Sequence, residues 1–285
     1  MHIDFIKTLP QYLLPKRALT LFAGLMANCR VKWIKNFLIS DFIARYGVNM
    51  QLAQEENPKA YACFNDFFIR QLKSKHRPIA SVDIISPVDG VVSQFGSIQQ
   101  GQFIQAKGRS YGVEELLACD AGLAKLFYAG QFATFYLSPK DYHRIHMPLQ
   151  GDVREMVHVP GKLFSVQPMT ARAIPKLFAQ NERLVVFFDT DVGLMAMVLV
   201  GAVVVGSIAT TWHGDLYRSH VTMTYQYDDL TQTITLQKGD EMGHFKLGST
   251  VILLFAEGKR IHWQSDLRLG QSISFGEGIA SIQRV

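Results

Sequence analysis

Hydrophobic and polar positions follow two different periods along this chain, and the change falls near Pro78. Before it, apolar residues recur every three or four positions, which is the spacing of one face of a helix. This part predicts three helices, and the third begins at Asn57-Pro58, a favourable N-cap with proline at the first helical position. After Pro78, short apolar runs alternate with Gly, Pro and Asp turns, which is typical of antiparallel strands. The predicted helices span 15–29, 31–46 and 57–72, with shorter ones near 113–118 and 172–178; the predicted strands span 91–95, 133–137, 184–188, 195–205, 220–227, 231–236, 251–255 and 271–275.

These elements predict an α+β fold. A helical N-terminal module over residues 1–78 would pack on a β-rich, mainly antiparallel domain over residues 79–285. Apolar residues make up 48% of the chain, which is enough for a sizeable core. The stretch 162–183 mixes apolar and basic residues, and it fits either a lipid-facing lid or a loop packed on the core.

The basic residues concentrate in the N-terminal quarter. Residues 1–80 hold twelve Lys and Arg against five Asp and Glu, whereas residues 81–285 hold seventeen against nineteen. Such a bias suits an anionic membrane or a nucleic acid, but here the basic residues flank an apolar helical stripe. That pattern fits a helix lying in a membrane interface, or a helix packed on the protein's own core. The stripe consists of Ala18, Leu21, Phe22, Leu25, Met26 and Cys29, flanked by Lys16, Arg17 and Arg30.

The apolar runs, the cysteines and the first residues restrict where the protein acts. No run reaches the about 20 apolar residues that span a bilayer. Cys29, Cys63 and Cys119 are scattered, with neither metal-site nor disulfide spacing, which suits a reducing compartment. The first seven residues lack the pattern of a signal peptide. We therefore expect a peripheral protein on the cytoplasmic face of the cell membrane.

The Gly248-Ser249 peptide bond is open to attack by its own serine hydroxyl. Glycine leaves its carbonyl accessible and its backbone free to bend, so the Ser249 hydroxyl could attack the Gly248 carbonyl. The resulting ester could then be lost by β-elimination, which would leave a pyruvoyl group. Taken alone, however, Gly-Ser-Thr before an apolar strand is more often an ordinary turn.

An attacking serine needs a base, because a free hydroxyl is a weak nucleophile. His143 and His146 stand three apart and would share one face of a helical turn. They could equally be two partly buried histidines or half of a metal site, although no third metal ligand has a recognisable spacing. Asp89 lies in an Asp-Gly pair between apolar runs, which fits a hairpin turn or a catalytic carboxylate at a turn tip.

Six segments, in this order, together resemble the phosphatidylserine decarboxylase family. The resemblance covers essentially the whole chain after the first few dozen residues. The segments are Phe64-Asn65-Asp66-Phe67-Phe68-Ile69-Arg70, Ser86-Pro87-Val88-Asp89-Gly90, Asp141-Tyr142-His143-Arg144-Ile145-His146-Met147-Pro148, the stretch 159–166, the stretch 201–206, and Lys246-Leu247-Gly248-Ser249-Thr250 with the apolar strand that follows.

The resemblance implies roles for particular residues. Asp89, His146 and Ser249 would form a self-cleavage triad that cuts after Gly248 and leaves fragments 1–248 and 249–285 associated. The pyruvoyl group from Ser249 would form a Schiff base with phosphatidylserine, release carbon dioxide and yield phosphatidylethanolamine. His143 would serve this second reaction as proton donor or substrate contact, and Ser165 is a weaker candidate for the same pocket. No pyridoxal phosphate, metal or nucleic acid is implied.

Two other classes of function stay open at this point. A serine hydrolase could use the same Asp, His and Ser, but no Gly-x-Ser-x-Gly nucleophile elbow is present. A non-catalytic membrane-surface module would treat the motifs as turns. The sequence also leaves the oligomeric state open, a homo-oligomer included.

Overall fold

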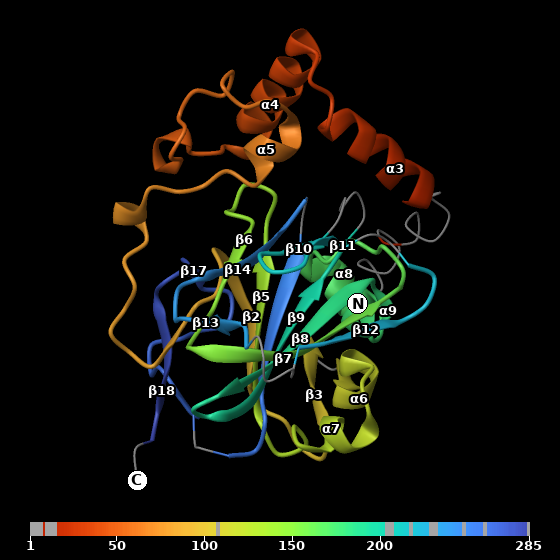
Figure 1. Cartoon of the computed structure of the whole chain (residues 1–285), viewed down its shortest axis with the longest axis vertical. Coiled ribbons are helices and arrows are strands. Elements are labelled where there is room, and N and C mark those ends of the chain that lie inside the picture. Colours follow the sequence, from red (N-terminus) through yellow and green to blue (C-terminus); the bar gives the residue numbers. More distant parts are fainter. Residues whose placement is uncertain are drawn as a thin grey trace.

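A computed structural model describes residues 8, 16–106, 109–202, 208–216, 219–227, 233–246, 249–258 and 261–283. Its three N-terminal helices lie at one end of a β-rich body, the shorter helices lie beside the sheet, and the C-terminus lies at the other end (Figure 1). The α+β class is therefore confirmed. The helices are α3 (Lys16–Ala27), α4 (Lys32–Tyr46), α5 (Phe64–Phe68), α6 (Val113–Leu117), α7 (Ala121–Lys125), α8 (Pro168–Ala173) and α9 (Leu177–Gln180).

One large antiparallel sheet forms the centre of the body. Its strands follow the order β12-β7-β8-β9-β15-β5-β2-β17, with β13 also paired to β7. The C-terminal strand β15 lies in the middle, paired to β5 on one side and β9 on the other. The bounds are β2 (Gly90–Ser97), β5 (Gln131–Leu137), β7 (Gly151–Val159), β8 (Arg183–Thr190), β9 (Gly193–Val200), β12 (Met223–Gln226), β13 (Thr235–Leu236), β15 (Ser249–Phe255) and β17 (Ser272–Ile273).

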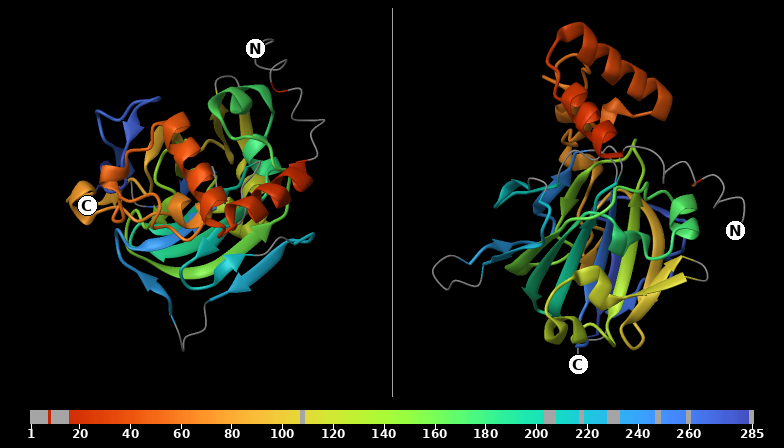
Figure 2. Two further views of the ribbon diagram at one scale, coloured as in Figure 1. Left: turned by 90° about the horizontal axis from the view of Figure 1, so that it is seen from above. Right: turned by 90° about the vertical axis from the view of Figure 1, so that its right-hand side faces the viewer.

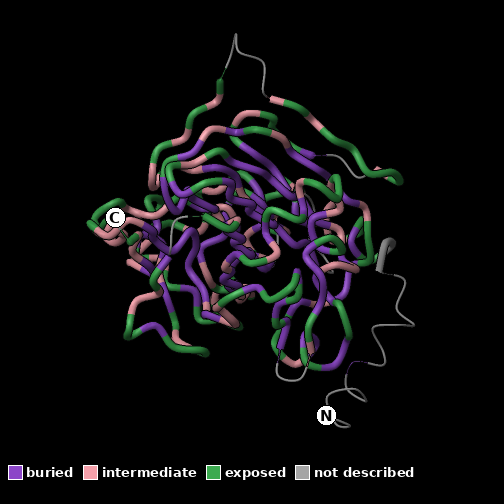
Figure 3. Tube along the Cα trace, turned by 90° about the horizontal axis from the view of Figure 1, so that it is seen from below, coloured by how far each residue is buried: buried purple, intermediate pink, exposed green. Residues whose placement is uncertain are grey.

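Both faces of this sheet are buried. All seven residues of β15 are buried, and the five apolar ones, 251–255, alternate between two hydrophobic clusters. Val251 and Leu253 pack in one cluster, and Ile252 and Leu254 pack in the other. A run that is apolar at every position is typical of a strand covered on both sides. Figure 3 shows the buried residues gathered in the sheet and the exposed ones along the loops around it.

Different elements cover the two faces. Two small sheets, β11-β10-β14-β6 and β1-β18-β16, contribute apolar residues to the first cluster. Helices α6, α8 and α9 and the hairpin β3-β4 contribute to the second. The remaining bounds are β1 (Ile84–Ile85), β3 (Gln102–Ala106), β4 (Arg109–Gly112), β6 (Arg144–His146), β10 (Ile208–Thr210), β11 (Gly214–Leu216), β14 (Glu241–Phe245), β16 (Ile261–Trp263) and β18 (Gly278–Ile282).

The N-terminal helices have a small core of their own. Ile39 of α4 packs with Phe64, Phe67 and Phe68 of α5, and the group projects from the end of the β-rich body (Figures 1 and 2). On α4, Asp41 and Arg45 lie one helical turn apart and form an ion pair at 3.0 Å. The domain boundary at residue 78 stays a prediction.

The third predicted helix is wrong in its extent. Only the five residues of α5 are helical between 57 and 72. The Asn57 side chain accepts the hydrogen bond from the Lys59 N–H that a cap would accept, but the chain forms a single turn there and does not continue as a helix. At the other end, the chain turns back so that the Gln54 N–H donates to the Gln71 carbonyl. Of the apolar face predicted for this helix, Phe64 and Phe68 pack in the small core with Tyr61 against it, whereas Leu72 packs against a different cluster.

Other predicted elements hold with changed limits. Pro175 lies between α8 and α9, so the stretch near 172–178 contains two short helices rather than one. The apolar side chains of stretch 162–183 are buried in the second cluster, Phe164 and Phe178 among them, which favours the packed loop over the lid. Strand β7, with eight paired positions against β8, was not predicted because Asp152, Arg154 and Glu155 interrupt the apolar pattern.

Candidate active site

Asp89 lies in a turn between β1 and β2 that is pressed against β5. A Cβ atom at the following residue, Gly90, would lie 2.4 Å from the Tyr136 carbonyl oxygen, so only glycine fits there. The Asp89 carboxylate is buried and accepts two hydrogen bonds from the Arg77 guanidinium, the Nε one at 2.8 Å. It also accepts one from the Phe275 N–H at 2.8 Å. The hydrogen bonds to Asp89 raise the pKa of Arg77, so the pair is an ion pair.

The partners of His146 fix its tautomer. Its Nδ1 lies 2.8 Å from the Gly239 carbonyl oxygen, which can only accept, so Nδ1 carries the proton. Its Nε2 therefore presents a lone pair, and it accepts a hydrogen bond from the Tyr142 hydroxyl at 3.0 Å. Burial lowers the pKa of His146, which favours the neutral ring. A neutral imidazole with an unprotonated Nε2 has the form that a general base needs.

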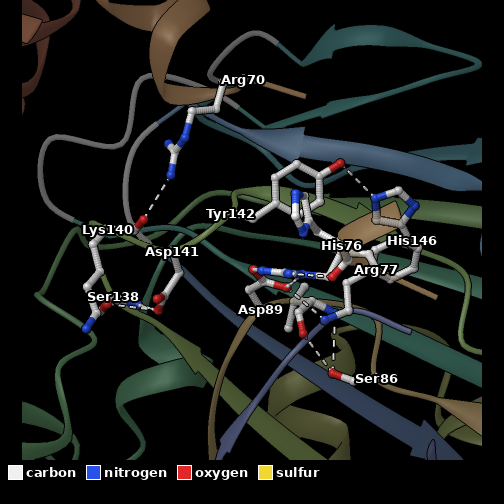
Figure 4. A network of polar contacts seen from close by, with 12 residues as sticks. Arg70, His76, Arg77, Ser86, Asp89, Ser138, Lys140, Asp141, Tyr142 and His146 are labelled. Carbon is white, nitrogen blue, oxygen red and sulfur yellow. Dashed lines mark hydrogen bonds and ion pairs between the residues drawn. The ribbon is translucent and has the colours of Figure 1, made fainter. Parts of the chain in front are cut away.

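Asp89 and His146 are neighbours without a direct hydrogen bond. They meet at Phe275, whose N–H bonds to Asp89 and whose ring stacks on the imidazole at 3.6 Å between ring centroids. Figure 4 shows both side chains in one polar network with Arg77 and Tyr142. The Asp89 charge nevertheless acts on His146, because it opposes the fall in the pKa of that ring. Its influence in this arrangement is electrostatic.

His143 and His146 do not share a face, so the helical-turn interpretation is wrong. Arg144–His146 is a strand, β6, which pairs with β14. Side chains alternate along a strand, so residues three apart point to opposite sides. His146 packs against Tyr142 and Phe275, whereas His143 stacks on Phe68 of α5 with centroids 4.1 Å apart.

His143 is completely buried. Its Nε2–H donates to the Ser138 carbonyl at 3.1 Å, and its Nδ1 has no partner among the described residues. Burial lowers the pKa of His143 to about 3, and the positive charge of Arg70 contributes to the shift. The ring is therefore neutral near neutral pH, with one unused acceptor.

Ser249 is the first residue of β15 and is also completely buried. It lies opposite Leu137, one residue before the serine whose carbonyl binds His143. Within the described part of the chain, its Oγ has no hydrogen-bond partner. A buried hydroxyl without a partner is costly, so its retention suggests a use other than stability. Its neighbour Gly248 lies outside the described residues.

Two further motifs converge on this end of the sheet. Thr250 is paired with Val200, the last residue of β9. The Asn181 side chain then joins Gly201 to Phe164, donating to both carbonyls at 2.9 and 2.8 Å. Ser165 follows directly and is half-buried, and its Oγ accepts from the Gln167 N–H at 3.4 Å. The stretch Val203–Gly206 of the second motif lies outside the described residues.

Comparison with known proteins decides the family. The family model described as phosphatidylserine decarboxylase matches residues 64–281, and a second model, described as PSD, matches residues 6–47. A phosphatidylserine decarboxylase proenzyme of Legionella pneumophila strain Lens is 53% identical over 282 residues, covering 99% of this chain and 100% of that protein. The chain belongs to the phosphatidylserine decarboxylase family. Proenzymes of the same description from Polaromonas sp. (strain JS666 / ATCC BAA-500) and Azotobacter vinelandii are 51% and 50% identical, covering 96% and 95% of this chain and 97% and 98% of those proteins.

Membership of the phosphatidylserine decarboxylase family makes this chain an enzyme of the carboxy-lyase class. Within the described part of the chain, His, Cys, Asp and Glu form no cluster of three or more that could hold a metal ion. Nor is any described helix long and apolar enough to cross a membrane.

Sequence reasoning missed several residues of this decarboxylase site. Arg77, Tyr142 and Gly239 bind Asp89 and His146, yet only Tyr142 stood in a quoted motif. Tyr142 is 4 residues from His146, Arg77 is 12 from Asp89 and Gly239 is 93 from His146. Spacing along the sequence therefore could not identify Arg77 or Gly239 as site residues.

Proposed function

We propose that this chain is a self-processing phosphatidylserine decarboxylase that makes phosphatidylethanolamine with a pyruvoyl group derived from Ser249. The names of its relatives supply the substrate and the word proenzyme, which fits a precursor that is cut. The observation that carries the proposal is the Ser249 Oγ, which is fully buried at the start of the central strand, directly after Gly248, and has no hydrogen-bond partner among the described residues.

In the proposed cleavage, the neutral His146 removes the Ser249 proton. Its Nε2 lone pair is the acceptor, held in that tautomer by the Gly239 carbonyl at Nδ1. In this structure that lone pair accepts from the Tyr142 hydroxyl, so the proposed step requires Tyr142 to give way to Ser249. The Asp89 charge nearby stabilises the imidazolium that forms. The Ser249 Oγ then bonds to the Gly248 carbonyl carbon, and the Gly248–Ser249 C–N bond breaks to give an ester and a free amine. Loss of the Ser249 α-proton and of the Gly248 carboxylate leaves an enamine, which takes up water and releases ammonia.

The residues around Ser249 fit the resulting pyruvoyl group. It would stand at the start of β15, between β5 and β9, where the serine hydroxyl already occupies an enclosed position without a hydrogen bond. It supplies an electron sink for decarboxylation of an amino acid headgroup. His143, with its unused Nδ1 acceptor, offers a contact to the substrate ammonium. Its low pKa favours this contact over proton donation while the ring stays buried.

The two fragments should stay together after cleavage. Residues 249–285 supply β15, paired at seven positions with β5 and six with β9. They also supply β17, β16 and β18, and the first and last of these pair with strands of the larger fragment. Separation would expose both faces of the central sheet, which costs about 25 cal/mol for each Å² of apolar surface.

Borohydride trapping tests the proposal. Reduction of the enzyme in the presence of phosphatidylserine should attach the lipid headgroup covalently to fragment 249–285, as read by mass spectrometry. Without borohydride, the adduct should be absent. Attachment to a lysine of the larger fragment, or activity in a chain with Ser249 intact, would contradict the pyruvoyl mechanism.

The N-terminal helices supply a surface for membrane docking. Leu21, Phe22 and Leu25 of α3 are 65–74% exposed, as are Trp33 at 74% and Phe37 at 68% on α4. Large apolar side chains gathered on two neighbouring helices mark an interaction site. The excess of twelve basic over five acidic residues in 1–80 suits anionic lipid. The enzyme is thus proposed to sit peripherally on the cytoplasmic face of the cell membrane.

Vesicle co-sedimentation measures this docking. Replacing Leu25 and Trp33 with glutamate should weaken binding to phosphatidylserine vesicles by at least about tenfold, because each side chain loses roughly 1.5–3 kcal/mol of apolar burial. High salt should release only part of the wild type, since it screens charge and leaves apolar contacts in place. The matched control is Leu269→Glu, a 56% exposed leucine outside the helices, which should bind normally. Equal binding by all three proteins would rule out this surface.

A further inference from the structure

Arg70 is a buried cation whose hydrogen bonds are largely unmade. The residue is 5% exposed, and among the described residues its Nε and Nη1 have no hydrogen-bond partner. Only Nη2 is bound, to the Lys140 carbonyl at 3.0 Å, and the guanidinium lies over the Phe67 ring at 5.4 Å. Burial lowers the pKa of Arg70, which records the cost of keeping this charge out of water.

A second buried arginine shows how this fold treats a structural guanidinium. Arg183 is 3% exposed, and all three of its nitrogens donate to backbone carbonyls at 2.6–3.2 Å. The Arg70 guanidinium lacks such a full set of hydrogen bonds. Within the described part of the chain it also forms no ion pair with any carboxylate. An unpaired buried cation calls for an anion, which none of the described residues supplies.

Arg70 stands beside the candidate catalytic residues. It follows Phe68, whose ring stacks on His143, and its charge acts on the pKa of that histidine. Figure 4 shows its side chain pointing towards the segment that carries Lys140, Asp141 and Tyr142. It also borders a cleft of about 350 Å³ that is lined by Gln54, Glu55, Tyr61, Asp66, Ile69, Gln71 and Arg144. The cleft gives an approach from solvent.

We infer that Arg70 binds the phosphodiester of the lipid headgroup and so sets its position against Ser249 and His143. This inference rests on the proposed function. A phosphodiester keeps its negative charge throughout the reaction, whereas the carboxylate loses its charge as carbon dioxide leaves. A fixed cation on the carboxylate would stabilise the substrate more than the transition state and slow the reaction. The chemistry therefore assigns Arg70 to the phosphate.

The experiment compares Arg70→Met and Arg70→Lys with wild type and with Arg183→Met. Phosphatidylserine serves as substrate and phosphatidylethanolamine, which has the phosphate but no carboxylate, as competing ligand, both in detergent micelles. In Arg70→Met, KM for the first and the inhibition constant for the second should rise by the same factor, roughly 10- to 100-fold. Arg70→Lys keeps the positive charge but lacks the planar set of donors of a guanidinium. Its KM and inhibition constant should therefore lie between those of the wild type and those of Arg70→Met.

Thermal stability separates this role from a structural one. Arg70→Met removes an unsatisfied buried charge, so the Tm of the ligand-free protein should stay equal or rise. Stabilisation by phosphatidylethanolamine micelles should disappear. Arg183→Met should lower Tm by at least about 5 °C, because it removes satisfied buried hydrogen bonds.

Each other outcome overturns the inference. A raised KM with unchanged phosphatidylethanolamine affinity assigns Arg70 to the carboxylate. A lowered Tm with unchanged lipid affinity makes it structural. Failure of the proposed function is read separately, from wild-type protein that neither cleaves nor decarboxylates; the micelle-induced shift in Tm then still decides whether Arg70 binds the phosphate.

Discussion

Replacing Ser249 with alanine is expected to leave a single full-length chain that has no decarboxylase activity. The Ser249 hydroxyl is the proposed nucleophile, and alanine has none to attack the Gly248 carbonyl. Because the Oγ makes no hydrogen bond among the described residues, its removal should not lower Tm. Denaturing gels and intact mass should show fragments 1–248 and 249–285 for the wild type and the uncut chain for the variant.

The matched control for this prediction is Thr134→Val. Thr134 is a buried hydroxyl residue on the neighbouring strand β5, paired with Ile252. It should be cut like the wild type, which shows that a changed side chain in the central sheet does not itself prevent cleavage. Cleavage of Ser249→Ala at the same bond would refute the proposed nucleophile.

Substitutions of His146 and His143 should affect self-cleavage and decarboxylation separately. His146→Gln removes the base and should reduce self-cleavage by about 10²–10⁴-fold. His143→Gln should still be cut, but it should decarboxylate more slowly by a factor of similar size. Time courses of fragment formation and of carbon dioxide release on purified protein measure the two effects. The reverse assignment would follow if His146→Gln were cut and His143→Gln were not.

The pH dependence of cleavage also tests whether His146 is the base. The base must be neutral, and burial lowers the pKa of His146 below its ordinary value of 6.5. Cleavage by the wild type should therefore fall to half of its full rate only at a pH below 6.5. Asp89→Asn removes one of the two carboxylate charges that oppose this shift, Glu241 being the other, so the midpoint should move lower still.

The sequence alone determined the class of the fold and the residue types of the site. The run Val251–Phe255 is apolar at every position, and such a run can only be a strand covered on both faces or a buried helix segment. Its β-branched start and short length favour the strand, which the structure has as β15. Period and turn residues likewise placed α4, β5 and β8 within a few positions. These signals are local, so one stretch of chain carries them completely.

Only the tertiary structure decided how the site residues relate to one another. Asp89 could be expected to hold His146, yet the fold gives it Arg77 and gives the imidazole Nδ1 to the Gly239 carbonyl. Those partners come from different segments of the chain, and their meeting depends on how β6, β14 and the turn before β2 stack. Periodicity along one segment cannot encode such a meeting. The same reason hid Arg70: its motif was visible in the sequence, but burial without hydrogen-bond partners is a property of the packed molecule.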